Sequence, residues 1–324
     1  MIRHFELSLG GRRRRFARTY TTMLEQVMFQ GQWVSRLCSG DAEVLIDPAQ
    51  GGRILVWRKG DWEILHWPKD ADWDHLSHAR GGNPILFPFL GRTFLHGQKG
   101  LWADEQGVVR PAPMHGFARD SAFRVVDGGK DYLRLALSAN DTTLACYPFS
   151  FRFDLEYRLT EEALETVFRV TNQGEKSMPW SGGHHFYFKV PADKRKEWKL
   201  TLPCQEWGRQ EFTTGKISTE PAGNSSAFVA NPDWVDRLHL QPDPRGVELE
   251  HLPSKRRLAF ELSPTESGVW SCVTTWTEKE DSDFFCVEPW TALPNAIHHG
   301  RGLRKIAPSQ SEEAVCRIVA THPN

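Results

Sequence analysis

The feature that most constrains the fold is an alternation of apolar and polar side chains over residues 149–159, FSFRFDLEYRL. From Phe149 to Leu159 every second residue is apolar, and charged or hydroxyl side chains stand between them. Successive side chains of a β-strand point to opposite faces, so this period of two predicts a strand with one buried face and one polar face. We therefore expect a sheet that covers a core.

A second alternation follows after a short turn, in residues 161–172 (EEALETVFRVTN), where Leu164, Thr166, Phe168 and Val170 share one face. Together the two segments predict an antiparallel hairpin. We expect further strands at short apolar stretches that are bounded by turn residues, namely 42–48, 52–57, 131–141, 256–263, 269–277, 283–290 and 313–320.

Helices are expected to be few and short. The sequence has no convincing long amphipathic pattern, and residues 20–30 and 69–79 are the only weak candidates. The 26 glycines and 20 prolines are spread along the chain and mark frequent turns. Many short strands with regular turns predict an all-β sandwich or barrel. Since no linker-like stretch divides the chain, we expect residues 28–324 to form a single domain.

The N-terminal stretch is basic and differs from the rest of the chain. Residues 1–27 include four consecutive arginines but no apolar segment of the kind found in secretory signals. We expect these residues to be a disordered extension outside the domain, with Met23 as an alternative start of the protein.

Composition limits the partners and the compartment. The formal net charge of −1 argues against nucleic-acid binding. No apolar run approaches the roughly 20 residues that a membrane span needs. The six cysteines form no CxxC pair, so we expect reduced, mostly buried thiols in a cytoplasmic protein, with a disulfide framework or metal site as the alternative.

Chemistry-bearing residues gather in four segments that combine ionisable side chains with glycine or proline turns. These are ARGGNPILFPFLGRTF (79–94), APMHGFARD (112–120), PWSGGHHFYFKV (179–190) and FFCVEPWTALPNAI (284–297). Each presents a charged group or an imidazole at a turn, which is how a β scaffold displays a site. Two further histidine pairs, in DHLSH (74–78) and IHHG (297–300), lack a third ligand of matching pattern, so we expect no metal site.

In this order, GGNPILFPFLGR, PMHGFAR, HFYFKV and VEPWTALPNA resemble the motifs of the aldose 1-epimerase (galactose mutarotase-like) family. The usual forms of those motifs are GG-x-P-x-x-FP, HGFAR, HPYF or HTYF, and a late Glu-Pro. The resemblance extends from about residue 40 to 320 and implies an antiparallel β supersandwich. The HGFAR motif and VDRLHL look nearer to the branch of the glucose-6-phosphate 1-epimerases.

The activity that this resemblance implies is interconversion of the α and β anomers of a pyranose, without cofactor or metal. A base takes the proton of the C1 hydroxyl and an acid protonates the ring oxygen, so both groups should exchange protons near neutral pH. Histidine does so with its ordinary pKa, and a carboxyl group does so when it is partly desolvated.

The resemblance also assigns roles to residues. It implies Glu288 as the base and His185 as the acid. Phe186 stands where the family has Pro or Thr, so His184 stays open as the alternative acid. On a strand His185, Tyr187 and Lys189 would share one face, and His184 and Phe186 the other. His115 matches the histidine that hydrogen-bonds near the ring oxygen.

Sugar contacts are expected from further residues in or beside the motifs. Asp236 matches the family aspartate that holds sugar hydroxyls, with Asp233 as the alternative. Trp290 and Trp180 are candidates for stacking on the sugar. An anionic substrate would be recognised by charge-assisted hydrogen bonds from basic side chains. The candidates are Arg92 first, then Arg119, Arg53 and Lys189.

Three function classes follow. The first is an aldose 1-epimerase acting on a free aldohexose or a hexose 6-phosphate, and the second is a carbohydrate-binding protein without turnover. The third, glycoside hydrolysis, needs two carboxyl groups beside the bond and leaves the histidines without a role. The partner is a sugar or sugar phosphate, and the chain is expected to be a monomer or a weak homodimer.

Overall fold

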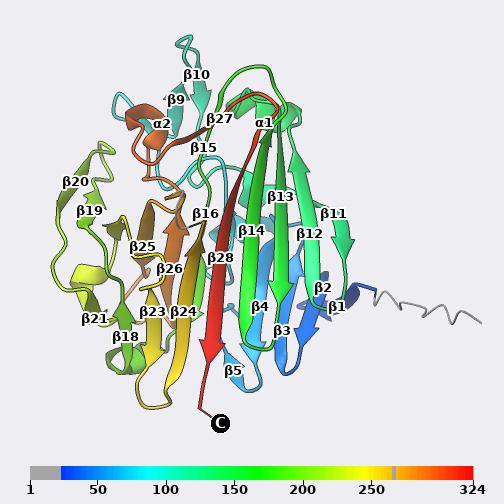
Figure 1. Ribbon diagram of the computed structural model, residues 1–324, viewed down its shortest axis with the longest axis vertical. Helices are drawn as coiled ribbons and strands as arrows, with labels where there is room; N and C mark the ends of the chain where they lie inside the picture. Colours follow the sequence, from blue (N-terminus) through cyan, green and yellow to red (C-terminus); the bar gives the residue numbers. More distant parts are fainter. Residues whose placement is uncertain (1–22, 265–267, 324) are drawn as a thin grey trace, which may run out of the picture.

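The protein is a layered stack of antiparallel sheets (Figure 1). The computed structural model describes residues 23–264 and 268–323. One layer is a nine-stranded sheet with β28 at its centre. Its strands in spatial order are β11 Arg124–Gly128, β12 Tyr132–Ser138, β13 Phe151–Leu159, β14 Ala163–Asn172, β28 Ser311–Thr321, β24 Arg256–Ser263, β23 Glu248–His251, β18 Trp198–Thr201 and β21 Ser226–Phe228.

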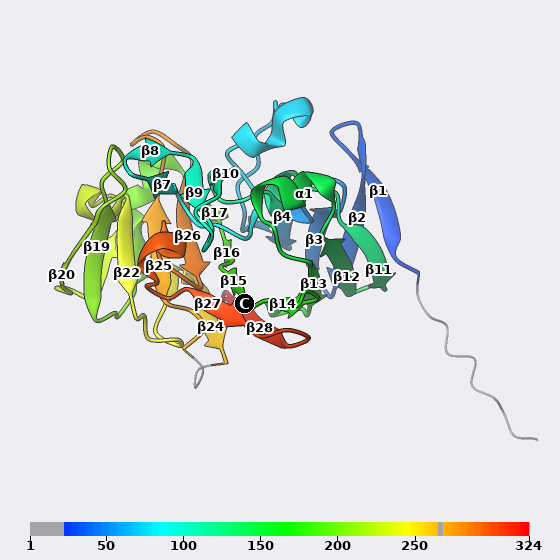
Figure 2. The same cartoon turned by 90° about the horizontal axis from the view of Figure 1, so that it is seen from above.

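Two further sheets make up the other layer, and seen from above the nine-stranded sheet bridges them (Figure 2). The five-stranded sheet contains β1 Glu25–Phe29, β2 Gln32–Ser39, β3 Ala42–Asp47, β4 Arg53–Lys59 and β5 Trp62–Glu63. The eight-stranded sheet runs in the order β20 Ile217–Pro221, β19 Glu206–Gln210, β22 Arg237–Leu240, β25 Cys272–Trp276, β26 Phe284–Trp290, β16 Gly183–His184 and β6 Ile85–Leu86, and β17 Phe186–Lys189 also pairs with β26.

Small elements close the ends of the layers. Three two-stranded ribbons pair β7 Phe94–Leu95 with β8 Gln98–Lys99, β9 Leu101–Ala103 with β10 Val109–Pro111, and β15 Met178–Trp180 with β27 Arg304–Ile306. The helices are α1 Asp141–Cys146, α2 Ala296–His299 and the 3₁₀ turns η1 Trp73–His78, η2 Ala118–Asp120, η3 Ala192–Glu197 and η4 Pro232–Trp234. No helix among the described residues is long and apolar enough to cross a membrane.

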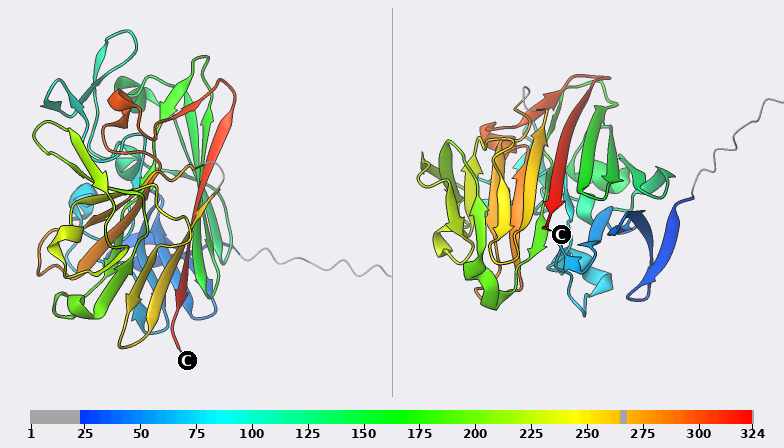
Figure 3. Two further views of the ribbon diagram at one scale, coloured as in Figure 1. Left: turned by 60° about the vertical axis from the view of Figure 1, so that its left-hand side comes forward. Right: turned by 60° about the horizontal axis from the view of Figure 1, so that its bottom comes forward.

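The turned views show the sheets facing one another (Figure 3), and the main apolar core cluster contains residues of all three large sheets. The alternating residues of β13 from Phe151 to Leu159 are all buried, and β13 pairs with β14 in the predicted hairpin. Phe168 of β14, Trp57 of β4 and Phe285 of β26 join the same apolar cluster. The prediction of an all-β sandwich with few short helices is therefore confirmed, and each further stretch predicted as a strand contains one.

The two weak helix candidates have other structures among the described residues. In the first, residues 20–30, β1 begins at Glu25 and pairs with β2, so residues 25–27 of the predicted extension 1–27 belong to a strand. None of the residues of β1 is fully buried, so the segment carries little apolar–polar alternation to recognise. The other candidate, 69–79, forms only the 3₁₀ turn η1. Residues 1–22 lie outside the described residues. All six cysteines are free thiols, as expected.

Candidate active site

One face of the eight-stranded sheet forms the floor of a pocket with a cavity volume of about 140 Å³. Leu238 of β22 is opposite Thr274 of β25, and Thr274 is opposite Glu288 of β26. All three side chains line the pocket. The loop over 77–92 and the turn over 114–119 contribute its walls. The pocket is thus a row of neighbouring strand residues covered by loops.

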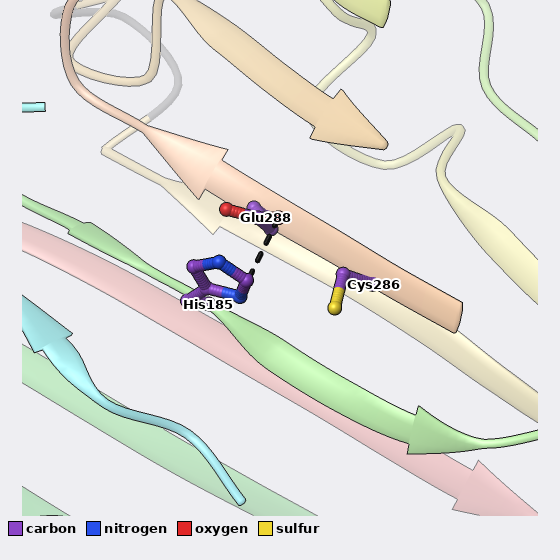
Figure 4. Close-up of side chains that lie close together, drawn as sticks. All are labelled: His185, Cys286 and Glu288. Atoms are coloured by element: carbon purple, nitrogen blue, oxygen red, sulfur yellow. Dashed lines mark ion pairs between the residues drawn. The ribbon is translucent and has the colours of Figure 1, made fainter. Parts of the chain in front are cut away.

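His185 extends this row by one strand. It lies between β16 and β17, and the pairing on both sides, Gly183 with Trp290 and Phe186 with Val287, places it opposite Glu288. His185 Nδ1 and Glu288 Oε1 are 3.4 Å apart. Figure 4 shows the two side chains and marks their ion pair with a dashed line. Residues directly opposite on antiparallel strands bring their side chains together. The predicted acid and base therefore meet as cross-strand neighbours.

The open choice between the two adjacent histidines has a clear structural outcome. His185 and Tyr187 line the pocket, and their rings are stacked with centroids 4.6 Å apart. His184 points to the other face, where its ring is 4.6 Å from Phe168 and 4.8 Å from Phe186 in the core. His185 is therefore the histidine that faces the pocket, although its role as the acid stays a prediction.

Burial shifts both members of the pair. It raises the pKa of Glu288 well above its ordinary value, and the negative charge of Asp236 adds to the rise. Burial lowers the pKa of His185 well below its ordinary value, and the nearby His115 and Arg119 lower it further. The expectation that the histidine would work with its ordinary pKa was therefore wrong. Both shifts favour uncharged forms, because a buried charge is costly.

His115 is held in the pocket by a strained turn. Its φ of 65° is in the left-handed region, as is the φ of 53° of Asp236. Such outliers persist where the surroundings fix them, and they cluster at functional sites. The N–H of Gly91 donates to His115 Nδ1 at 3.3 Å. Since burial lowers the pKa of His115 well below its ordinary value, the neutral ring carries its proton on Nε2 and can donate it.

Most of the other predicted sugar contacts also reach the pocket. Asp236 lies exposed at its rim, and the ring of Trp290 is 5.8 Å from that of His115. Arg119 lines the wall, with its Nε 3.6 Å from Asp120. The guanidinium of Arg92 lies 3.8 Å from the ring centroid of Phe212. The structure thus brings Asp236, Trp290, Arg119 and Arg92 into one pocket with His185 and Glu288.

Two predicted residues, Lys189 and Trp180, lie away from the pocket. Lys189 lies outside the pocket and forms an ion pair with Glu63, because β17 leaves the site two residues after Tyr187. Trp180 is fully buried in the core, and its indole donates to Glu312. Neither is positioned to touch a sugar in this pocket.

Arg53 reaches the pocket wall but is occupied by the backbone. Its guanidinium donates to the carbonyls of Leu76, Ala79 and Gly81. Burial lowers the pKa of Arg53 to about 10. These contacts favour support of the loop over 76–81 rather than the predicted contact with substrate.

Sequence reasoning assigned no role to several pocket residues. Tyr187, which it placed on the same face as His185, and Trp276 form aromatic walls, and Arg80 stacks over Trp276 with its guanidinium 5.4 Å from the ring centroid. Arg80 stands in the first motif segment, so its charge was visible in sequence. Trp276 was not recognisable, because only its place in β25 beside β26 directs it into the pocket.

One group of described residues could hold a metal ion by distance. The ligand atoms of His185, Cys286 and Glu288 lie within 4.8 Å of one another (Figure 4). Cys286 and Glu288 are two residues apart on β26 and so share a face. Four arginines, Arg53, Arg80, Arg92 and Arg119, line the same pocket. Their positive charge opposes a dication there, so the surroundings fit proton transfer better than a metal.

Known structures share the whole architecture. A galactose mutarotase-like protein from Clostridium acetobutylicum superposes with a TM-score of 0.79 at 19% identity, over 94% of this chain and 99% of that chain. The Slr1438 protein from Synechocystis sp. PCC 6803 gives a TM-score of 0.77 at 23% identity, over 99% of this chain and 100% of that chain. At these identities the likeness defines a class by fold, the galactose mutarotase-like β supersandwich.

Sequence comparison defines the family within that class. The aldose 1-epimerase family profile matches residues 36–318. The LacX protein of Lactococcus lactis subsp. lactis (plasmid) is 22% identical over 265 residues, which cover 77% of this chain and 85% of LacX. The chain belongs to the aldose 1-epimerase family, and it is an isomerase that acts on carbohydrates. The predicted nearness to the glucose-6-phosphate branch stays a prediction.

Proposed function

We propose that the protein interconverts the α and β anomers of an aldohexose by opening and closing the pyranose ring. The observation that carries this proposal is the buried pair of His185 and Glu288, with 3.4 Å between Nδ1 and Oε1 in the wall of the pocket. An acid and a base so close can serve the C1 hydroxyl and the ring oxygen of one sugar, which are bonded to the same carbon.

The pair needs one proton to work. Both pKa shifts favour that proton on Glu288 and a neutral imidazole on His185. Transfer of the proton gives a carboxylate and an imidazolium. Glu288 then takes the proton of the C1 hydroxyl while His185 donates one to the ring oxygen. The C1–O5 bond breaks, C1 becomes a carbonyl, rotation about C1–C2 exposes its other face, and closure reverses both transfers.

Other pocket residues bind and orient the sugar in this proposal. The Nε2–H of His115 donates a hydrogen bond near the ring oxygen, which stabilises developing charge without a proton transfer. Asp236 accepts hydrogen bonds from sugar hydroxyls. The indole of Trp290 and the ring of Tyr187 cover the apolar C–H side of the ring, which removes that surface from water.

A hexose 6-phosphate is the second candidate substrate, and the arginines favour it. Among the four arginines that line the pocket, Arg92 forms no ion pair within the described part of the chain, and its guanidinium lies over the ring of Phe212. A guanidinium without an ion-pair partner can bind a phosphate through two hydrogen bonds. Arg92→Gln should then raise KM for glucose 6-phosphate by about tenfold or more, as loss of a charge-assisted hydrogen bond does, and leave glucose unaffected.

Polarimetry on freshly dissolved α-glucose, α-galactose and glucose 6-phosphate tests the proposal. Glu288→Gln should lower kcat by about 10²- to 10⁴-fold, the usual contribution of a general base, with an unchanged fold. A variant that relaxes every sugar as fast as the wild type contradicts the mechanism. If the wild-type protein binds these sugars but accelerates none of them, the binding-protein alternative is correct.

The setting of the reaction stays a prediction. The six free thiols fit a reducing compartment, so we expect the protein to work in the cytoplasm. We expect a monomer or a weak homodimer, with small sugars and no nucleic acid as partners.

A further inference from the structure

The side chain of Asn83 connects the two adjacent histidines. It is fully buried, and its Oδ1 accepts a hydrogen bond of 2.9 Å from the backbone N–H of His185. Its Nδ2 lies 3.0 Å from Nδ1 of His184. One carboxamide therefore contacts the pocket histidine through the backbone and the core histidine through the ring.

The chemistry of the donors fixes the direction of both bonds. A backbone N–H can only donate, so the oxygen of Asn83 must face His185 and its NH₂ must face His184. Nδ1 of His184 must then be the unprotonated nitrogen. Burial lowers the pKa of His184 to about 3, so the ring is neutral at working pH and stays an acceptor. His184 thus keeps the carboxamide of Asn83 in one orientation.

The backbone of Asn83 is also fixed. Its N–H donates to the carbonyl of Ile54 on β4 at 2.8 Å. The preceding Gly82 has a φ of 66°, and a Cβ there would lie 2.0 Å from the same carbonyl oxygen, so only glycine allows this approach. Asn83 therefore reaches His185 from a backbone position that is anchored to β4 of the five-stranded sheet.

The bond to His185 stands where the strand ladder is interrupted. His185 falls between β16, which ends at His184, and β17, which begins at Phe186. The side chain of Asn83 therefore supplies the acceptor for its N–H. Without this bond the backbone of His185 can shift relative to Glu288, and a shift of about 1 Å can lower a rate by about 100-fold.

We propose that Asn83 is the positioning residue for the general acid, and that His184 acts with it by holding its carboxamide in the productive orientation. This inference rests on the proposed function, because kcat can fall only if His185 and Glu288 catalyse the reaction. It also gives His184 a role in positioning His185.

The test compares Asn83→Ala and His184→Phe with a matched control, Asn172→Ala, in the full chain. Asn172 is also fully buried, and its side chain donates to the carbonyls of Lys176 and Ile306, which do not line the pocket. Polarimetry gives kcat and KM, and thermal unfolding gives Tm. The phenylalanine keeps the aromatic contacts of His184 in the core but removes the acceptor.

We expect Asn83→Ala and His184→Phe to lower kcat by about 10- to 100-fold, the range expected for misplaced reacting groups, with KM within about threefold. Asn172→Ala should lower Tm but keep kcat. The double variant should be no slower than the slower single variant, because the two residues act as one unit. The inference is overturned if Asn83→Ala keeps wild-type kcat, or if Asn172→Ala loses kcat equally.

A second readout does not depend on activity. Amide hydrogen exchange of ¹⁵N-labelled protein reports whether the N–H of His185 is bonded. We expect its protection to fall in Asn83→Ala and to persist in Asn172→Ala. Unchanged protection in Asn83→Ala overturns the inference even in an active enzyme. If the wild type proves inactive but the protection falls as expected, the proposed function fails while the hydrogen bond assigned to Asn83 stands.

Discussion

At the scale of single residues, the number of protons bound by His185 and Glu288 determines how the rate should depend on pH. The lowered pKa of His185 and the raised pKa of Glu288 mean that the pair holds one proton over a wide pH range. Below that range His185 takes up a second proton, and above it Glu288 loses the shared one. A bell-shaped profile of kcat/KM reports these two steps for the pair and not for either residue alone.

We therefore predict that kcat/KM stays flat through pH 6.5, the ordinary pKa of histidine. Its acid limb should lie well below this value. Initial rates of mutarotation, corrected for the buffer reaction and extrapolated to zero buffer concentration, give the profile. A limb centred near 6.5 would mean that His185 titrates as a free imidazole and that the pair does not share one proton.

The same carboxyl group makes folding stability depend on pH. An unfolded glutamate titrates near 4.5, and burial raises the pKa of Glu288 above that value in the folded protein. The contribution of this group is fully present below the unfolded pKa, and it is lost as pH rises through the folded pKa. Ionisation of Glu288 thus opposes folding at neutral pH.

We predict that Glu288→Gln is more stable than the wild type, by a margin that grows as pH rises from 4.5. Glutamine does not titrate, so the variant does not lose folding stability as Glu288 does when the pH rises. Urea unfolding at several pH values gives the free energy of unfolding. Glu105→Gln is the control, because the Glu105 side chain is 85% exposed. If the difference in free energy of unfolding between Glu288→Gln and the wild type stays constant or shrinks with rising pH, ionisation of Glu288 does not cause the loss of stability.

At the scale of elements, the turn over 114–119 depends on one glycine. Gly116 has a φ of 75°, and a Cβ there would lie 2.1 Å from the carbonyl oxygen of Phe87, within the backbone of a neighbouring segment. Phe117 N–H donates to that same carbonyl, so the segment cannot move away without losing a bond. The turn positions His115 immediately before Gly116.

We predict that Gly116→Ala lowers the free energy of unfolding by at least about 2 kcal/mol, since it adds a clash to the left-handed backbone cost. Gly97→Ala is the control, because Gly97 has a φ of 81° but nothing within 4 Å of a Cβ. It should lose only about 1 kcal/mol, the cost of the backbone alone. Urea unfolding measures both, and equal losses would contradict the role of the Phe87 contact.

Strand order explains what the sequence could and could not predict. The alternation of β13 is local, so the amino-acid sequence alone reveals it. Glu288 and His185 were found by motif, yet their meeting depends on the pairing of β17 with β26, which no local pattern encodes. Asn83 reaches His185 only because β6 pairs with β16, across about a hundred residues of chain. Lys189 was misplaced because its strand leaves the pocket.

At the scale of the whole molecule, the N-terminal boundary of the domain decides how much chain the fold needs. The sequence pattern predicts that the extension ends at residue 27, but β1 begins at Glu25. Glu25, Gln26 and Val27 pair with residues of β2, and Arg36 forms an ion pair with Glu25. These pairings cover the edge of β2 within the five-stranded sheet.

Two truncations separate the predicted boundary from the observed one. A chain that begins at Met23 keeps all of β1 and every pocket residue, so we predict wild-type Tm and mutarotation rate. A chain that begins at Met28 loses three of the five residues of β1, and it exposes the N–H and C=O groups of β2 as an unpaired edge. Its Tm should fall by about 2 °C for each 1 kcal/mol of lost pairing in a protein of this size, with a greater tendency to aggregate in light scattering. Equal Tm values for the two chains would restore residue 27 as the boundary, whereas a lower rate in the Met23 chain would place part of the function in the first 22 residues.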